Sequence, residues 1–226
     1  MAAAWRLSAD PPALAIRKLG DRLYLISGGN DGNVAVFLWS DGVVLVDTMS
    51  EGRGQNILDL IRTVTNRPVT HILNTHTHFD HVGGNPFFPE QVEVVVQENT
   101  AGQMPAMREF SRPDTRQGLP DRMFKDSLTL FSGDDAIDLR YFGAAHTNGD
   151  TFVVFRAAGV MHAGDTFPGV NVVTRNGGNE SAYPATMSRA AAEITGVHTV
   201  IPGHGDPETW QAFVDNAAAI REGRER

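Results

Sequence analysis

The apolar residues of this chain fall into short runs separated by glycine, proline and polar residues, a pattern typical of a protein rich in β-strands. Buried strands are predicted at residues 15–26, with a turn near Gly20, and at 34–39, 43–46, 69–73, 92–96, 128–131, 136–142, 151–155, 160–162 and 197–201. Asp31-Gly32 precedes one run and Asp41-Gly42 joins two of them. Asp-Gly between apolar runs is a strong hairpin signal, so the first part of the chain is predicted to contain β-hairpins.

Four segments carry apolar residues at helical spacing. Helices are predicted at residues 50–66, 98–110 and 185–195, and a last one is predicted to begin at Asp206-Pro207. Ser50 is the predicted N-cap of the first helix, and Gly196 is predicted to end the third. Residues 111–125 are polar and predict a surface connection. Residues 167–181, rich in glycine and asparagine, predict a long loop.

Both halves of the chain run strands, then a helix, then a strand, then a polar loop. This order predicts an α/β fold of the αββα type, in which two central mixed β-sheets form a sandwich with helices on the outer faces. Residues 1–13, which include Pro11-Pro12, are predicted to form a flexible N-terminal tail. Residues 14–226 are predicted to be a single domain, because this length fits one domain and no linker or repeat divides it.

The composition limits which partners the chain can bind through its charge and which side chains can carry out chemistry. The 19 basic and 27 acidic residues give a formal charge of −8, so the overall field gives no reason to bind nucleic acid or an anionic membrane. The absence of cysteine excludes disulfides, thiolate ligands and a thiol nucleophile. The N-terminus lacks the apolar core of a signal peptide, and no run approaches the roughly 18 apolar residues of a membrane-spanning helix. We therefore expect a cytoplasmic protein, or a periplasmic one whose signal peptide has been removed.

A motif of three histidines and an aspartate, His-Thr-His-Phe-Asp-His, follows the predicted strand at 69–73. His76 and His78 are two residues apart, so in an extended segment they project to the same side. Asp80 and His81 come where the chain must turn, and they can serve a second point beside the first. Imidazole and carboxylate are zinc ligands, and such a set is costly to bury without a partner. The motif therefore predicts a metal site.

Three further candidate ligands lie at or just past the ends of predicted strands and are flanked by small residues. They are His146 in a Gly-Ala-Ala-His run, Asp165 in an Ala-Gly-Asp run and His204 in a Pro-Gly-His-Gly run. Loops at the ends of strands on a rigid scaffold are where sites are usually built. The remaining histidines are interpreted as structural: His71, His162 and His198.

With these motifs in this order, the chain resembles the metallo-β-lactamase-fold superfamily of hydrolases over nearly its whole length. The resemblance implies an αββα fold with two Zn²⁺ ions per chain, or iron or mixed metals in their place. It implies that the first ion is held by His76, His78 and His146. It implies that the second is held by Asp80, His81 and His204, with Asp165 bridging both and Asp47 lying behind them as a buried carboxylate.

The ligand set departs from that of the true β-lactamases. Many of them use cysteine at the second metal, whereas a bridging Asp165 is the pattern of glyoxalase-II-like enzymes and lactonases. Pro168 and Gly169 stand where some lactamases keep a lysine for the carboxylate of the drug. Glyoxalase II proper carries an additional helical region for the glutathione part of its substrate, whereas this chain ends after one short helix.

The function that these features predict is a dinuclear zinc hydrolase. A metal-bound hydroxide would attack the carbonyl of a small ester, thioester, lactone or amide. Asp80 and Asp165 are the predicted catalytic residues, the first as a proton shuttle and the second because it fixes the metal separation at roughly 3.5–4 Å. Three alternatives stay open: a β-lactamase, an oxidoreductase with one iron that resembles the persulfide dioxygenases, and a non-catalytic binding protein. The predicted partner is a small molecule, and the chain is expected to be a monomer or a homodimer.

The predicted substrate wall comes from two loops. Residues 28–32 predict a small flap over the metals, with Asn30 facing the substrate. The long loop is predicted to supply Phe167, Asn171, Arg175 and Tyr183. In this hypothesis Tyr183 donates a hydrogen bond to the developing oxyanion and Arg175 pairs with an anionic substrate.

Overall fold

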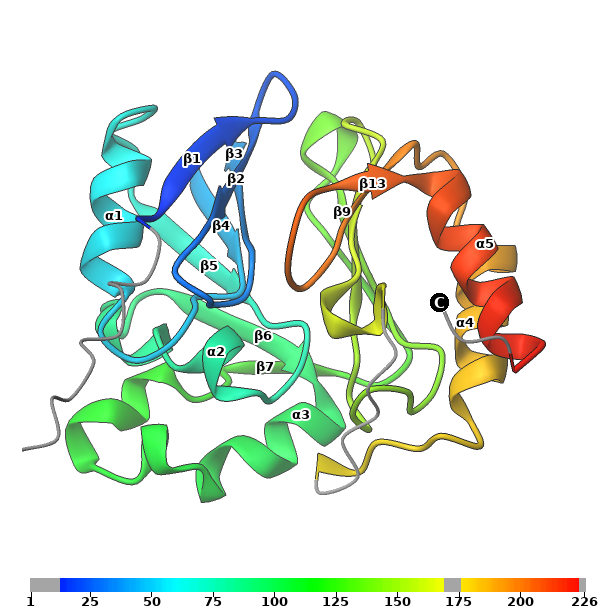
Figure 1. Cartoon of the computed structure of the whole chain (residues 1–226). Coiled ribbons are helices and arrows are strands. Elements are labelled where there is room, and N and C mark those ends of the chain that lie inside the picture. The colour runs from blue at the N-terminus through cyan, green and yellow to red at the C-terminus, as the bar shows by residue number, and fades with distance from the viewer. Residues whose placement is uncertain (1–12, 169–175, 224–226) are drawn as a thin grey trace, which may run out of the picture.

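Two β-sheets face each other, and helices cover their outer faces (Figure 1). The structure is a computed structural model that describes residues 13–168 and 176–223. It confirms the predicted αββα sandwich of two mixed sheets. The predicted N-terminal tail lies, apart from Ala13, outside the described residues.

The first sheet has seven strands in the order β1-β2-β3-β4-β5-β6-β7. Neighbours are antiparallel from β1 to β4 and parallel from β4 to β7, which makes the sheet mixed. The strands are β1 (Ala15–Lys18), β2 (Leu23–Ser27), β3 (Val34–Trp39), β4 (Gly42–Val46), β5 (Val69–Leu73), β6 (Glu93–Gln97) and β7 (Arg122–Phe124).

The second sheet has six strands in the order β13-β12-β11-β10-β9-β8. Only β11 and β12 are parallel among its neighbouring strands. The strands are β8 (Ser127–Leu130), β9 (Ile137–Arg140), β10 (Phe152–Phe155), β11 (Val160–His162), β12 (Thr199–Ile201) and β13 (Glu208–Thr209).

The α-helices are α1 (Gly54–Arg62), α2 (Phe79–Val82), α3 (Glu98–Gln103), α4 (Tyr183–Glu193) and α5 (Trp210–Arg221). Short 3₁₀ helices occupy Asn85–Phe87, Met104–Ala106, Arg108–Phe110, Pro113–Gly118, Gly133–Asp135 and Gly164–Thr166. In Figure 1, α1 lies on the outer side of the first sheet, and α4 and α5 lie on the outer side of the second.

Three apolar clusters hold these layers together. The inner faces of both sheets meet in the first cluster, where the rings of Phe37 and Phe155 lie 5.3 Å apart. The second joins the first sheet to α1 through Ile57 and Ile61, and the third joins the second sheet to α4 and α5. Removal of this apolar surface from water is the main stabilising contribution, and it leaves the strand ends free to carry polar loops.

The structure corrects the predicted start of the first helix. The helix begins at Gly54 rather than near residue 50, and Arg53 precedes it without capping it through its side chain. Ser50 instead contacts Asp31: the hydroxyl and the N–H of Ser50 both donate hydrogen bonds to the Asp31 carboxylate. The prediction was wrong because a long-range partner in the β2–β3 loop takes the hydroxyl that a local cap would use.

The predicted helix at 98–110 is also corrected. α3 ends at Gln103, and two 3₁₀ turns follow. Pro105 explains the break, because proline has no N–H for the helical ladder and clashes with the preceding turn. The segment 111–125 is more than a connection, since it contains β7 at the edge of the first sheet.

The last helix begins at Trp210 and not at Asp206-Pro207. Glu208 and Thr209 first pair with β12 as a short strand. The hydroxyl of Thr209 then accepts a hydrogen bond from the Ala212 N–H at 3.1 Å and caps α5.

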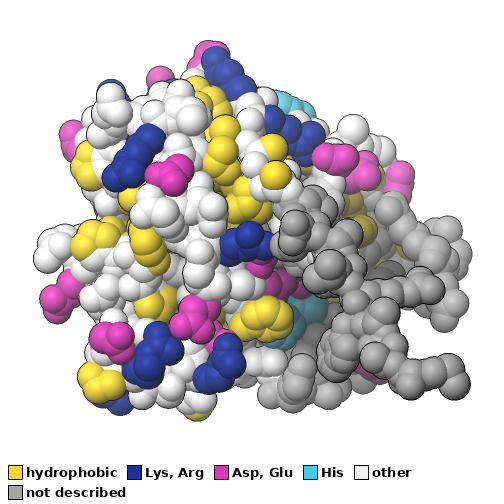
Figure 2. Space-filling view, turned by 60° about the vertical axis from the view of Figure 1, so that its left-hand side comes forward, with side chains coloured by type: hydrophobic (Ala, Val, Ile, Leu, Met, Phe, Trp, Pro, Cys, Tyr) yellow, Lys and Arg dark blue, Asp and Glu magenta, His cyan; other side chains and the backbone are white. Residues whose placement is uncertain are grey.

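Basic and acidic side chains are interspersed on the face shown in Figure 2. None of the helices in the described part of the chain has the length and apolar character needed to cross a membrane.

Candidate metal centre

The structure brings the seven predicted ligands together at one edge of the sandwich, between the two sheets. They come from the segments that follow β5, β9, β11 and β12, which Figure 1 shows converging near α2. They form two adjoining groups, and within each group the ligand atoms lie within 4.8 Å of one another. The first group is His76, His78, His146 and Asp165, and the second is Asp80, His81 and His204.

Asp165 lies between the two groups and turns one oxygen toward each. Its Oδ2 lies 3.4 Å from His146 Nε2 and 3.8 Å from His76 Nε2. Its Oδ1 lies 3.3 Å from His81 Nε2 and 3.6 Å from His204 Nε2. This is the arrangement that a carboxylate bridging two cations requires.

The other ligand atoms converge in the same way. His146 Nε2 and His78 Nδ1 are 3.0 Å apart, with the two rings nearly perpendicular. In the second group, Asp80 Oδ2 lies 3.1 Å from His204 Nε2 and 3.7 Å from His81 Nε2. Each group therefore directs three or more lone-pair donors at one point.

Three buried polar atoms of this centre have no hydrogen-bond partner within the described residues: His76 Nε2, His81 Nε2 and Asp165 Oδ1. Buried polar atoms are rarely left unpaired, because the loss of water costs free energy that a new contact must offset. A cation in each group would take up these lone pairs. The donors are all imidazole nitrogens and carboxylate oxygens, which suit zinc and other first-row metals. The residues present thus fit two metal ions.

Asp47 orients two of the candidate ligands from behind. Its fully buried carboxylate accepts hydrogen bonds from the Thr75 N–H at 2.8 Å, from the Thr75 hydroxyl at 2.7 Å and from His81 Nδ1 at 2.7 Å. The Thr75 hydroxyl lies 2.9 Å from His76 Nδ1 and, having given its hydrogen to Asp47, accepts there. Both imidazoles thus carry hydrogen on Nδ1 and present the lone pair of Nε2 to the centre, as metal-binding histidines generally do.

The two groups differ in the pKa values of their histidines. Burial, which disfavours charge, holds the pKa of His76 well below its ordinary value and lowers that of His78 to about 4. Burial would also lower the pKa of His81, but the carboxylates of Asp165 and Asp47 outweigh it and raise that pKa well above 6.5. The hydrogen bond to Asp80 is the main reason that the pKa of His204 is raised.

The two carboxylates that face the histidines respond in the opposite direction. Burial alone would raise the pKa of Asp165, but the nearby imidazoles, His81 first, hold it well below its usual range. Burial would likewise raise the pKa of Asp80, yet its hydrogen bond with His204 lowers the pKa overall. The carboxylates of Asp165 and Asp80 therefore both stay ionised at neutral pH and can act as metal ligands.

The turn after His146 is held by a buried carboxylate that sequence reasoning missed. Asp150 accepts hydrogen bonds from the Thr147 N–H and hydroxyl, and burial raises its pKa to about 7. The Thr151 N–H donates to the Thr75 carbonyl at 2.8 Å, which joins this turn to the histidine motif. The signal for Asp150 was its place four residues after a candidate ligand in a segment rich in small residues.

The remaining histidines lie outside the two groups. His71 is half-buried in β5, 3.2 Å from Glu93, and His198 is exposed beside Thr199. His162 is fully buried, and its ring nitrogens contact the Asn33 carbonyl and the Gly164 N–H.

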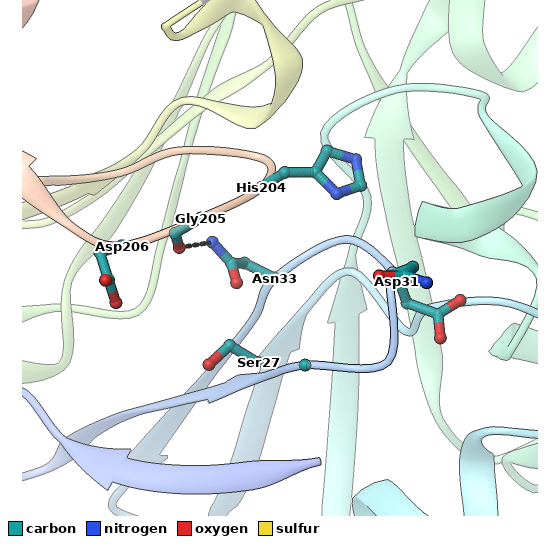
Figure 3. Close-up of a pocket in the computed structure, with 8 residues that line it drawn as sticks. Ser27, Asp31, Asn33, His204, Gly205 and Asp206 are labelled. Atoms are coloured by element: carbon teal, nitrogen blue, oxygen red, sulfur yellow. Dashed lines mark hydrogen bonds between the residues drawn. The ribbon is translucent and has the colours of Figure 1, made fainter. Parts of the chain in front are cut away.

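A hollow of about 470 Å³ opens beside His204 (Figure 3). Asn30, predicted to face the substrate, lines it from the β2–β3 loop. That loop is fixed by the Arg53 guanidinium, which donates to Asp31 at 2.7 Å, and by the Gly32 N–H, which donates to the Asp80 carbonyl at 3.2 Å.

Two of the other predicted wall residues, Phe167 and Tyr183, do not line the hollow. Phe167 and Tyr183 are corrected, because both are buried in the apolar cluster beneath α4 and α5. The Tyr183 hydroxyl donates to the Thr166 carbonyl at 2.8 Å, so it is already paired. The positions of Asn171 and Arg175 lie outside the described residues.

Phe79 is an apolar side chain that the prediction of the substrate wall omitted. It stands between His78 and Asp80 in the motif, and 60% of its surface is exposed. Exposure of a large ring costs free energy in water, so a large exposed aromatic beside a metal centre suggests contact with a ligand.

The comparison with known families finds a match over residues 28–213 to the family described as the metallo-beta-lactamase superfamily. Hydroxyacylglutathione hydrolase of Erythrobacter litoralis is 30% identical over 170 residues, which are 68% of this chain and 61% of that protein. The metallo-beta-lactamase IND-1 of Chryseobacterium indologenes is 24% identical over 189 residues, 80% of this chain and 75% of that protein. The chain thus spans less than two thirds of the first of these relatives.

The fold is also found among solved structures. A metallo-beta-lactamase from Pontibacter korlensis superposes with a TM-score of 0.76 at 21% identity and covers 92% of this chain and 99% of its own. The DIM-1 metallo-beta-lactamase gives a TM-score of 0.77 at 17% identity, over 94% of this chain and 99% of its own. At these identities the likeness establishes the fold alone.

Proposed function

The chain belongs to the metallo-beta-lactamase superfamily, and from this membership and the geometry of the centre we propose that it is a dinuclear, zinc-dependent hydrolase. The proposed substrate is a small ester, thioester, lactone or amide. The observation that carries the proposal is the pair of ligand groups joined by the two oxygens of Asp165, with three buried ligand atoms left unpaired by the described residues. Hydrolytic relatives such as hydroxyacylglutathione hydrolase support the reaction class.

In this proposal the two metal ions, when bound, supply a hydroxide at neutral pH and polarise the carbonyl that it attacks. The protein residues hold the two ions and orient the groups around them. His76, His78 and His146 would bind the first ion, Asp80, His81 and His204 the second, and Asp165 both.

Asp80 also suits the role of proton carrier. Its Oδ2 faces His204 and His81, and its Oδ1 would accept the proton released on attack and pass it to the leaving group. The lowered pKa of Asp80 keeps its carboxylate ionised at neutral pH, so that the free oxygen can accept a proton and does not already carry one.

The proposal is tested by metal analysis of gently purified protein together with a panel of neutral esters, lactones, thioesters and β-lactams. We expect about two zinc ions per chain and hydrolysis that a chelator abolishes and zinc restores. One iron per chain, with oxygen uptake in the presence of a persulfide, would replace this proposal with the oxidoreductase. A chain that takes up neither metal would overturn both.

Hydrolysis of β-lactams is the second candidate. Two of the curated relatives, IND-1 and the type 2 enzyme of Bacteroides fragilis, are metallo-beta-lactamases. The β-lactams in the substrate panel test this candidate. If they are turned over faster than simple esters, β-lactam hydrolysis becomes the preferred proposal.

The pKa difference between the groups gives a prediction about acidification. Metal binding displaces protons from histidine, so affinity falls once the pH drops below the pKa of the ligands. The pKa values of His81 and His204 are raised, so the affinity of the second group for metal should begin to fall above pH 6.5. In the first group, the pKa of His76 lies well below 6.5 and that of His78 is about 4, so these two ligands stay neutral to a much lower pH.

We therefore expect zinc in the second group to be lost first as the pH is lowered from 8 to 5, while one zinc per chain remains. Zinc content after equilibrium dialysis at each pH measures this order. Loss of both ions over one and the same pH range would contradict it.

Phe79 gives a prediction about the substrate. If its exposed ring packs on the apolar part of the substrate, Phe79→Ala should raise KM for esters with a phenyl or hexanoyl group by about 10-fold, which corresponds to losing part of a buried ring. KM for the matching acetate ester, kcat and zinc content should stay close to those of the wild type.

Met123→Ala is the matched control, because Met123 on β7 is also 60% exposed. Equal changes of KM in the two variants, or an equal change for acetate and hexanoate esters in Phe79→Ala, would show that Phe79 does not contact the substrate.

A further inference from the structure

We infer that Asn33 is a positioning residue for the second metal group. Its side chain and backbone fix the turn that carries His204. This inference rests on the proposed function, since it concerns how the chain holds a metal that the function requires. Asn33 is 2% exposed and lies at the end of the β2–β3 loop, far in sequence from the turn it contacts.

Asn33 donates three hydrogen bonds to the turn at residues 202–205, on both sides of His204. Its backbone N–H donates to the Gly203 carbonyl at 2.7 Å. Its side-chain Nδ2 donates to the Pro202 carbonyl at 2.9 Å and to the Gly205 carbonyl at 2.9 Å, the second drawn as a dashed line in Figure 3. A carboxamide has two N–H groups on one nitrogen, which an aspartate or serine side chain does not offer.

The carbonyl of Asn33 closes a ring of hydrogen bonds toward Asp165. The Gly164 N–H donates to His162 Nδ1 at 3.1 Å, so the hydrogen of this neutral ring sits on Nε2 and donates to the Asn33 carbonyl at 3.2 Å. The Gly203 N–H donates to the Gly164 carbonyl at 2.8 Å. Asn33, His162, Gly164 and Gly203 thus tie the His204 turn to the residue before Asp165.

The backbone packs so tightly here that this turn has little room to shift. A Cβ at Gly203 would overlap the Asp165 carboxylate, and a Cβ at Gly32 would lie 2.5 Å from the His81 ring. The β2–β3 loop therefore packs directly against His81, and the His204 turn packs directly against Asp165. Movement of the turn would change the distance from His204 to both Asp80 and Asp165.

His204 needs such support more than the other ligands do. Its side chain is 44% exposed, and it is the most exposed of the seven. His76 and His81 are each oriented through Nδ1 by the buried Thr75 and Asp47. His204 is instead positioned through the backbone of its turn, which accepts three hydrogen bonds from Asn33.

The test is zinc competition with a chromogenic chelator, which gives separate affinities for the two ions. For Asn33→Ala and Asn33→Asp we expect the affinity for the second zinc to fall about 10- to 100-fold, as for residues that orient metal ligands, with the first unchanged. Asn216→Ala is the control, because Asn216 is also a buried amide but donates to Pro168 at 3.3 Å. It should lower thermal stability without altering either affinity.

Several outcomes would overturn the inference. Wild-type affinities for both ions in a folded Asn33→Ala or Asn33→Asp would show that Asn33 stabilises the fold only. If Asn33→Ala does not fold, Asn33→Asp, which keeps the side-chain volume, decides the matter alone. An equal loss at the second ion in Asn216→Ala would show a general effect of destabilisation. A wild-type chain that binds no metal would overturn the proposed function, whereas two ions in the wild type and unchanged variants would overturn this inference only.

Discussion

Replacement of Asp165 by serine is expected to release the second metal first and to lower kcat by about 10³-fold or more. Its two oxygens face different ligand groups, at 3.4 Å from His146 and 3.3 Å from His81. Serine cannot reach both groups and carries no charge. A metal ion contributes several kcal/mol of charge stabilisation in such a reaction, and about 4 kcal/mol corresponds to 10³-fold in rate.

Zinc per chain and kcat measured on the same samples test this expectation. Asp138→Ser is the matched control, because Asp138 is a carboxylate on β9 that pairs with Arg156 outside both ligand groups. The control should keep two zinc ions and full activity. If Asp165→Ser retained two zinc ions of wild-type affinity, Asp165 would not bridge the groups, whatever happened to the rate.

The clustering of the candidate ligands could be predicted from the sequence because the ends of the strands can be recognised in it. The runs at 34–39, 69–73 and 160–162 match β3, β5 and β11 residue for residue. His76 and Asp165 follow two of these strands within three residues. A side chain at the end of a buried strand is fixed in space by the sheet, so a correct strand places the ligand as well.

Local sequence patterns did not reveal the supporting residues because their partners are distant in sequence, and Asp47 was predicted only from the family resemblance. Asn33 and its partner Pro202 are 169 residues apart, and Asp47 and His81 are 34 apart. No local pattern reveals such pairs. Ser50 failed as an N-cap for the same reason, since Asp31 competes for its hydroxyl.

The prediction that Phe167 and Tyr183 line the substrate wall was wrong because residue type alone does not distinguish a pocket aromatic from a core aromatic. Phe167 packs on Phe213 at 5.5 Å between ring centroids, within the core beneath α5. Phe79, which stands between two candidate ligands in the sequence, is instead exposed. Only the tertiary structure shows which of the two rings faces outward.

Asp47→Ala is expected to cause the largest loss of stability of any single substitution considered for this chain. It would leave the buried His81 Nδ1 and the Thr75 N–H and hydroxyl without their acceptor. Removing one partner of a buried charged network typically costs about 3–5 kcal/mol. For a domain of this size each kcal/mol lowers Tm by roughly 2–4 °C. Thermal unfolding of chelator-treated wild type and variant measures the loss without any contribution from metal.

Two further variants separate the hydrogen bonds from the backbone. Asp47 has φ +64°, a left-handed conformation that costs alanine about 1–2 kcal/mol by itself. Asn30→Ala, at φ +62° on the surface, measures that cost alone. Asp47→Asn tolerates the conformation and keeps one acceptor, so it should unfold at a higher temperature than Asp47→Ala yet bind the second zinc more weakly than wild type. A loss in Asp47→Ala no greater than in Asn30→Ala would show that the buried carboxylate adds nothing beyond its backbone geometry.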